Sequence, residues 1–118
     1  MTIQEKAKKI ASLLDDKKAL DIKTLEISKV STLADYFVIC TCTSTTQLRA
    51  CVDEVEEKMK ELGFIPAHIE GYRSGTWILM DYHDVVVHIF MEEARNFYDV
   101  ERLWADAEEI ISESRDAD

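Results

Sequence analysis

The sequence predicts an α/β fold in one domain, with a mixed five-stranded sheet, flanking helices and the element order αββαβββα. A length of 118 residues is typical of a single domain, so residues 1–118 are expected to form one unit. An apolar fraction of 47% is enough to fill its core. Segments with helical spacing of apolar residues alternate with short β-rich runs, and two of these runs are close enough for a hairpin. A hairpin among helix-linked strands requires a sheet of mixed direction.

The first helix is expected from Thr2 to Asp16. Thr2 and Glu5 form a T-x-x-E capping box, and apolar residues follow at helical spacing at Ile3, Ala7, Ile10 and Leu14. The segment Leu20–Ile27 alternates apolar and polar residues, which indicates a half-buried strand. The continuous apolar run Tyr36–Cys40 is typical of a strand covered on both faces, so we expect it at the sheet centre.

The second helix has the clearest pattern. Ser44 and Gln47 make another capping box, and the apolar stripe that follows contains Leu48, Val52, Val55, Met59 and Leu62. Gly63 comes after the last apolar position, where a left-handed C-terminal cap is easiest for glycine. Phe64–Ile69 is predicted to be a strand, and Pro66 favours an edge position or an irregular start for it.

The C-terminal half begins with a turn over Glu70–Gly75. Thr76–Tyr82 and Val85–Met91 are β-rich runs separated only by His83 and Asp84, which predicts an antiparallel hairpin. A last helix is expected from the helical spacing of Val100, Leu103, Trp104, Ala107, Ile110 and Ile111. The polar segment Ser112–Asp118 is expected to be a frayed tail.

Charge and cysteine usage restrict the class of partner and the compartment. With 14 basic and 24 acidic residues the net charge is −10, which disfavours sequence-specific nucleic acid binding and favours a basic protein partner. No apolar run approaches the roughly 20 residues of a membrane-spanning helix. The polar N-terminus resembles no secretory signal, and the odd number of cysteines, three, argues against a disulfide framework. A cytoplasmic protein without membrane contact is expected.

Two segments could carry chemistry. Thr41–Thr46 leads from a strand into a helix N-terminus, a place where phosphate can bind, but the Walker glycine-lysine pattern is missing and local capping explains the hydroxyls. Asp81–Asp84 together with His88 could ligate a metal, yet these are also ordinary turn residues without a recognised ligand spacing. We therefore predict no catalytic, cofactor-binding or metal site, and a nucleotide site remains an alternative.

An interaction surface is the stronger prediction. Side chains of the types that anchor interfaces gather in the C-terminal half, at Trp77, Met80, Tyr82, Arg95, Tyr98 and Trp104. Trp104 lies in an apolar helical stripe, which favours core packing for it. Because three helices cannot cover every position of the sheet, an exposed aromatic face is expected, and acidic neighbours such as Glu70 suit a basic partner.

Six segments in order along the chain resemble the ribosomal silencing factor (Iojap-like) family: ADYFVI (34–39), STTQ (44–47), EG (70–71), W-x-L-M-D-Y (77–82), DVVVHIF (84–90) and RNFYDVERLW (95–104). The resemblance implies a small α/β domain of nucleotidyltransferase-like topology that is a homodimer when free. It implies binding to the large ribosomal subunit through ribosomal protein L-fourteen, which would block association with the small subunit and lower protein synthesis under nutrient limitation. It implies no cofactor. Relatives in organelles are linked to large-subunit assembly.

The resemblance also implies residue roles. Partner binding would fall on Glu70, Gly71, Trp77, Met80, Asp81, Tyr82, Arg95 and Tyr98. Strand alternation puts Trp77 and Asp81 on the face opposite Met80 and Tyr82, so one flat partner cannot contact all of them.

Two departures from the family pattern bear on the alternatives. Family members commonly have glycine where this chain has Cys42 and His83. Cys42 makes a close phosphate approach harder, and His83 puts the hairpin geometry in question. The alternatives that remain are a nucleotide-binding, transferase-like enzyme and a large-subunit assembly factor without silencing activity.

Overall fold

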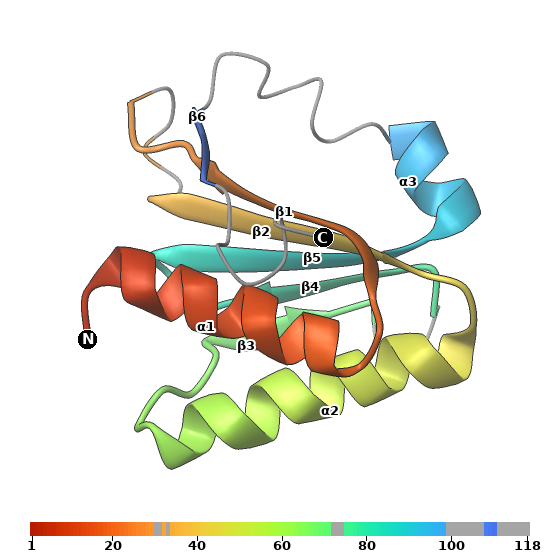
Figure 1. The fold of residues 1–118 in the computed structure, drawn as a ribbon, viewed down its shortest axis with the longest axis horizontal. Coiled ribbons are helices and arrows are strands. Elements are labelled where there is room, and N and C mark those ends of the chain that lie inside the picture. Colours follow the sequence, from red (N-terminus) through yellow and green to blue (C-terminus); the bar gives the residue numbers. More distant parts are fainter. Residues whose placement is uncertain (30–31, 33, 72–74, 99–107, 111–118) are drawn as a thin grey trace.

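The computed structural model describes residues 1–29, 32, 34–71, 75–98 and 108–110. The strands of this part form one mixed sheet in the order β3-β4-β5-β2-β1-β6 (Figure 1). Their bounds are β1 Leu20–Glu26, β2 Tyr36–Cys42, β3 His68–Glu70, β4 Trp77–Asp81, β5 Val85–Met91 and β6 Glu108–Ile110. The β2–β5 pair is parallel and the other pairs are antiparallel. All five predicted strands are present, so the predicted α/β fold with a mixed sheet is confirmed.

Three helices are described, and they lie on both sides of the sheet. α1 (Ile3–Asp16) and α2 (Thr45–Glu61) run side by side across one face, whereas α3 (Glu92–Tyr98) lies on the other (Figure 1). We call these the helix-covered face and the α3 face. The main core fills the space between the sheet and the first two helices, and a second cluster of apolar side chains, with Ala94 of α3 packed against it, covers the α3 face.

The central strands have the burial that their sequences predict. Every residue of β2 is buried, as expected for a strand with both faces covered. Along β5, Val85, Val87 and Ile89 pack on the helix-covered face, while Val86 and Phe90 pack on the α3 face. The predicted alternation and the central position of these strands are both confirmed.

The first helix start matches its sequence pattern, and the second differs from it in one respect. At α1, Glu5 N–H donates to Thr2 Oγ1 at 3.1 Å and Thr2 N–H donates to Glu5 Oε1 at 2.7 Å, so this capping box is complete. At α2, Ser44 Oγ accepts from Gln47 N–H at 3.0 Å, but the Gln47 side chain does not return to Ser44. Its amide instead donates to the carbonyl oxygens of Lys17 and Lys18, at 3.1 and 2.9 Å, and so joins the start of α2 to the end of α1.

The strand predicted over Phe64–Ile69 is shorter and later than expected. β3 contains only His68–Glu70. Phe64 N–H is used by the C-terminal cap of α2, where it donates to Met59 O at 2.8 Å, and Pro66 has no N–H to give. Sheet pairing can therefore begin only after the proline, and β3 is a three-residue edge strand.

The helix predicted over Val100–Ile111 is wrong at its end, because Glu108–Ile110 forms β6, which pairs with β1. α3 begins earlier, at Glu92, directly after β5. Residues 99–107, including Trp104, and the predicted tail Ser112–Asp118 lie outside the described residues. In the part of the chain that is described, no helix has the length and apolarity needed to cross a membrane.

Candidate functional site

An acidic edge of the sheet holds the exposed members of the predicted partner-binding set. Glu70 and Gly71 are exposed at the end of β3, and Trp77 and Asp81 are half-buried on β4. In the β3–β4 pair, His68 lies opposite Asp81 and Glu70 lies opposite Leu79, so these side chains share the α3 face. We call His68, Glu70, Gly71, Trp77 and Asp81 the edge surface.

His68 lies between the two carboxylates of the edge surface. Its Nε2 is 3.4 Å from Glu70 Oε1 and 3.7 Å from Asp81 Oδ2. All three side chains are at least partly exposed, so these contacts are screened by water and fix the geometry more than they stabilise the fold. The arrangement presents carboxylate oxygens to solvent on a short strand edge, which suits a basic partner.

Met80 and Tyr82 lie on the helix-covered face, as strand alternation predicts. Met80 is fully buried and Tyr82 is 4% exposed, and both belong to the main core. Burial raises the pKa of the Tyr82 hydroxyl. These two residues therefore pack the β4–β5 hairpin against the helices and do not belong to the edge surface.

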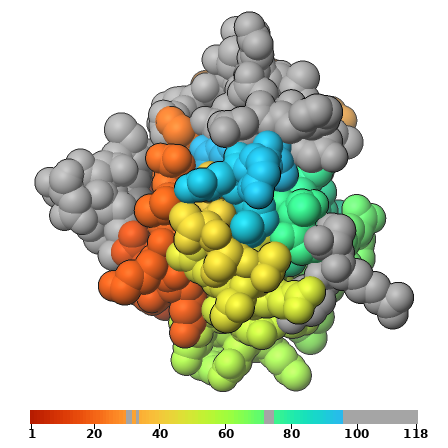
Figure 2. All heavy atoms as spheres, turned by 90° about the vertical axis from the view of Figure 1, so that its right-hand side faces the viewer, coloured from red at the N-terminus to blue at the C-terminus, as the bar shows by residue number. Residues whose placement is uncertain are grey.

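Arg95 is also buried, and it fixes α3 to the sheet. Its Nη1 donates to Asp21 O and to Thr41 Oγ1, each at 2.8 Å. Asp21 has a left-handed φ of 47° at an irregularity in the β1–β2 pairing. The hydrogen bond from the guanidinium therefore stabilises a backbone conformation that is rare for residues other than glycine. In Figure 2, the coloured first part of α3 lies directly against the start of α2 and the residues near position 20. Tyr98 is the last residue of α3, and its side chain lies outside the described part.

Trp77 connects the edge surface to the interior of the α3 face. Its Nε1 donates to His88 Nδ1 at 3.3 Å, and its ring stacks on Phe90 at a centroid distance of 5.0 Å. His88 also meets the edge of the Phe37 ring at 4.6 Å. The hydrogen bond to Nδ1 requires the neutral imidazole with its proton on Nε2, a buried atom that has no hydrogen-bond partner among the described residues. His88 is therefore a core residue and does not reach the hairpin turn.

Burial lowers the pKa of His88 from 6.5 to about 4, which predicts acid sensitivity. In the unfolded chain the His88 imidazole is protonated as the pH falls through about 6.5. In the folded protein it stays neutral until the pH reaches about 4. The stability that is present above pH 6.5 is thus lost on acidification, by about 2 kcal/mol between pH 7 and pH 5. Urea unfolding at these pH values measures the loss. A His88→Gln variant should lose less over the same interval, and an equal loss in both proteins would contradict the assignment.

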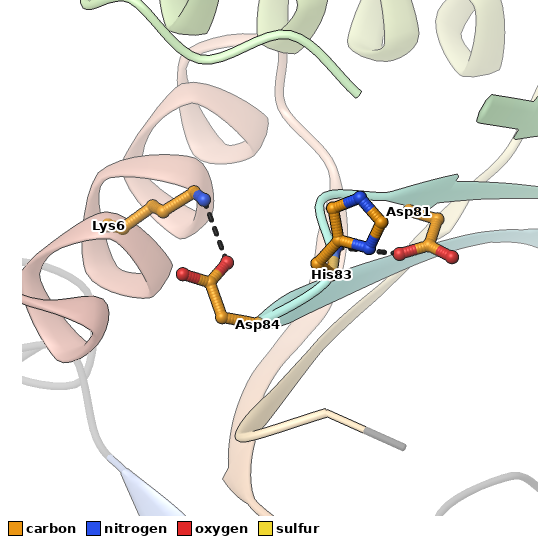
Figure 3. Close-up of polar contacts among 4 residues, drawn as sticks. All are labelled: Lys6, Asp81, His83 and Asp84. Atoms are coloured by element: carbon orange, nitrogen blue, oxygen red, sulfur yellow. Dashed lines mark hydrogen bonds and ion pairs between the residues drawn. The ribbon is translucent and has the colours of Figure 1, made fainter. Parts of the chain in front are cut away.

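The hairpin turn resolves the question that His83 raised. His83 has a left-handed φ of 71°, the conformation that glycine adopts most easily, and its N–H donates to Asp81 Oδ1 at 2.7 Å (Figure 3). The carboxylate supports the turn locally, as aspartate does in Asx-type turns. Among the residues that the structure describes, no group of three or more His, Cys, Asp or Glu side chains is placed to hold a metal ion.

The polar groups of the segment Thr41–Thr46, from the end of β2 to the start of α2, form hydrogen bonds within the fold. Thr41 accepts from Arg95, and Thr43 N–H donates to Gln47 Oε1 at 2.8 Å. Ser44 caps α2, while Cys42 packs against Cys51. These contacts agree with the capping interpretation of this segment.

Sequence reasoning missed an ion pair that braces the hairpin. Lys6 Nζ on α1 is 2.7 Å from Asp84 Oδ1 (Figure 3). The same ammonium lies over the rings of Phe64 and Tyr82, at 4.4 and 5.4 Å from their centroids. The sequence contains an indication that Lys6 is buried, because Lys6 comes three residues after Ile3 and therefore lies inside the apolar stripe of the first helix.

This chain is similar to known proteins over most of its length. A family model described as "Ribosomal silencing factor during starvation" matches residues 1–118. The protein named ribosomal silencing factor RsfS of Bacillus subtilis (strain 168) is 40% identical over 97 residues, which cover 82% of each chain.

A crystal structure of a protein from Chromobacterium violaceum has a TM-score of 0.86 and 39% identity, and the match covers 89% of this chain and 88% of that one. The mouse protein named "Mitochondrial assembly of ribosomal large subunit protein 1" is 33% identical over 98 residues, which are 80% of this chain and 43% of the mouse protein.

Proposed function

Since the chain belongs to the ribosomal silencing factor family, we propose that it binds the large ribosomal subunit through ribosomal protein L-fourteen and blocks association with the small subunit. The match of the family model to residues 1–118 is the observation that carries the proposal. The result is lower protein synthesis when nutrients are limiting. We propose further that the protein works in the cytoplasm and is a homodimer when free.

The edge surface is the proposed contact. Carboxylates at Glu70 and Asp81 would meet basic groups of the partner, and Trp77 supplies an aromatic side chain of the type that anchors interfaces. Tyr98 is kept as a proposed contact. Met80, Tyr82 and Arg95 contribute by holding β4, the hairpin and α3 in place, because all three are buried.

Steric exclusion accounts for the activity without bond-making or a cofactor. The factor and the small subunit would compete for one surface of the large subunit. The fraction of large subunits blocked then depends on the ratio of factor concentration to its dissociation constant, as for any competing ligand. The effect should reverse when small subunits are added in excess.

A subunit-joining assay tests the proposal. Purified large subunits are incubated with the protein, small subunits are added, and the fraction of joined ribosomes is measured by sedimentation. We expect joining to fall as the protein approaches saturation. Undiminished joining at saturating protein would overturn the proposal.

Reversing a charge on the edge surface should weaken binding to the ribosomal protein. Glu70→Lys changes an exposed side chain and is expected to weaken the affinity for isolated L-fourteen about tenfold at low salt, with a smaller effect at high salt. Glu57→Lys makes the same charge change on the exposed side of α2 and serves as the matched control. Calorimetric titration measures both. Equal weakening by the two variants would show a general charge effect and contradict this placement of the contact.

A role in large-subunit assembly is the second candidate. It is favoured by the name of the mouse relative, which refers to assembly of the ribosomal large subunit. The two roles differ in which particles carry the protein. Sedimentation of cell extracts separates them, because a silencing factor should travel with mature large subunits and a pure assembly factor only with immature ones.

A further inference from the structure

Two thiols from different elements touch in the main core. Cys42 is the last residue of β2, and Cys51 lies in the first half of α2. Their Sγ atoms are 3.7 Å apart, and both side chains are fully buried. Cys40, the third cysteine, is on the same face of β2 and is also buried. Neither the fold nor the proposed ribosome contact requires two thiols here, because any small apolar side chains could fill this space.

We propose that Cys42 and Cys51 form an oxidation site that reacts with a hydroperoxide, hydrogen peroxide being the smallest, and closes reversibly to a disulfide. The sulfur atoms are already in contact, so bond formation requires only a small approach of α2 toward the end of β2. The link would close a loop that contains the turn Thr43–Ser44 and the first turn of α2. This property is independent of ribosome binding and goes beyond the proposed function.

The reaction balances with the peroxide as the oxidant. One thiol gives up its proton, and its sulfur attacks a peroxide oxygen. The O–O bond breaks, and hydroxide leaves and takes a proton to become water, so the sulfur becomes a sulfenic acid. The second thiol then attacks that sulfur, the S–O bond breaks, and another water leaves. Two thiols and one peroxide thus give a disulfide and two waters, with two electrons passing from sulfur to oxygen.

The environment makes this reaction slow and dependent on local opening. A hydrogen bond with the Cys40 thiol raises the pKa of Cys42 to about 12, and contact with Cys42 together with burial raises the pKa of Cys51. Both thiols are therefore protonated near neutral pH, and the thiolate is the reactive form. Thr43 and Ser44, which follow Cys42, are exposed, so opening of this turn gives peroxide a route to the sulfur. The rate should rise about tenfold for each pH unit above neutrality.

Cys51 is a better partner for Cys42 than Cys40 is. Residues two apart in an extended strand have Cα atoms about 6.6 Å apart, near the upper limit that disulfides tolerate. A link within β2 would have to distort a central strand that is paired on both sides. A link from β2 to α2 leaves the sheet hydrogen bonds in place.

Peptide mapping of the folded full-length chain tests the proposal. After treatment with hydrogen peroxide and alkylation of the remaining thiols, trypsin should release residues 30–49 linked to residues 50–58, because cleavage after Arg49 separates the two cysteines. One thiol of the three, that of Cys40, should remain free. Formation of the disulfide should raise the melting temperature. Dithiothreitol should restore all three thiols and reverse this rise.

Two variants provide matched controls. Cys40→Ala should keep the linked pair of peptides, and Cys51→Ala should lose it. The proposal is overturned if residues 30–49 close on themselves, if the link joins two chains, or if the linked pair is absent when the folded protein has consumed peroxide. If Cys51→Ala does not fold, the peptide map of the unaltered chain alone decides among these outcomes.

Discussion

Gly71→Ala is expected to lower the free energy of unfolding by more than about 3 kcal/mol. Gly71 has a left-handed φ of 84°, and a Cβ atom added there would lie 2.1 Å from the carbonyl oxygen of Trp77. That oxygen is backbone, so relief requires β4 to move away from the turn. Gly71 O also accepts from Gly75 N–H at 3.2 Å, which closes the loop between β3 and β4.

Gly63→Ala is the matched control for this prediction. Gly63 also has a left-handed φ, of 92°, but a Cβ atom added there meets no atom within 4 Å in the part of the chain that the structure describes. It should therefore cost only the backbone strain, about 1 kcal/mol. Urea unfolding followed by circular dichroism measures both variants. Similar losses would show that the close approach to Trp77 adds nothing to the strain of a left-handed alanine.

The second large effect is expected from Asp84→Ala, which should cost about 3 kcal/mol of stability. Lys6 has only 8% of its side chain exposed, so removal of the carboxylate leaves a buried ammonium group without its counter-ion. The Asp84 side chain is 30% exposed and can take up water if Lys6 is removed instead. Lys6→Met removes the charge but keeps an unbranched apolar side chain near Phe64, whose ring centroid is 4.4 Å from Lys6 Nζ, and should cost about 1 kcal/mol or less.

The double variant distinguishes the cost of a buried, unpaired Lys6 ammonium group from the loss of the Lys6–Asp84 attraction. Lys6→Met combined with Asp84→Ala should be more stable than Asp84→Ala alone, because the second substitution removes the unpaired charge. Urea unfolding of the three variants gives the coupling free energy. If Lys6→Met is as costly as Asp84→Ala, mutual attraction, and not burial of one charge, accounts for the loss.

Local sequence signals predicted most elements, because those signals act over a few residues. The alternation in β5 and the continuous apolar run of β2 gave both strands, and the Thr2–Glu5 capping box gave the start of α1. Errors arose where tertiary contacts decide. Helical spacing was a weak guide to Glu108–Ile110, which pair with β1 in the sheet. Gln47 matched a capping pattern, yet its side chain reaches the carbonyls of the preceding helix end.

The candidate site could be predicted in part for the same reason. Alternation correctly separated Trp77 and Asp81 from Met80 and Tyr82. It could not show that Arg95 would be buried, because its partners, Asp21 and Thr41, lie far away in the chain. The Gly71 requirement was equally hidden, since it depends on the Trp77 carbonyl approaching across a turn. Motifs can thus identify a region of the molecule, but they do not distinguish its exposed residues from the buried residues that hold it in place.

The parallel pairing of β2 with β5 has a consequence for how the protein folds. Tyr36 pairs with Val85, so partners at the sheet centre are about 50 residues apart, with α2, β3 and β4 between them. The helices and the β4–β5 hairpin can form from local contacts, but the central pair must close this long loop. During synthesis from the N-terminus, β2 therefore keeps one unpaired edge until β5 has left the exit tunnel. A chain stalled before Val85 should be prone to aggregation through that apolar edge.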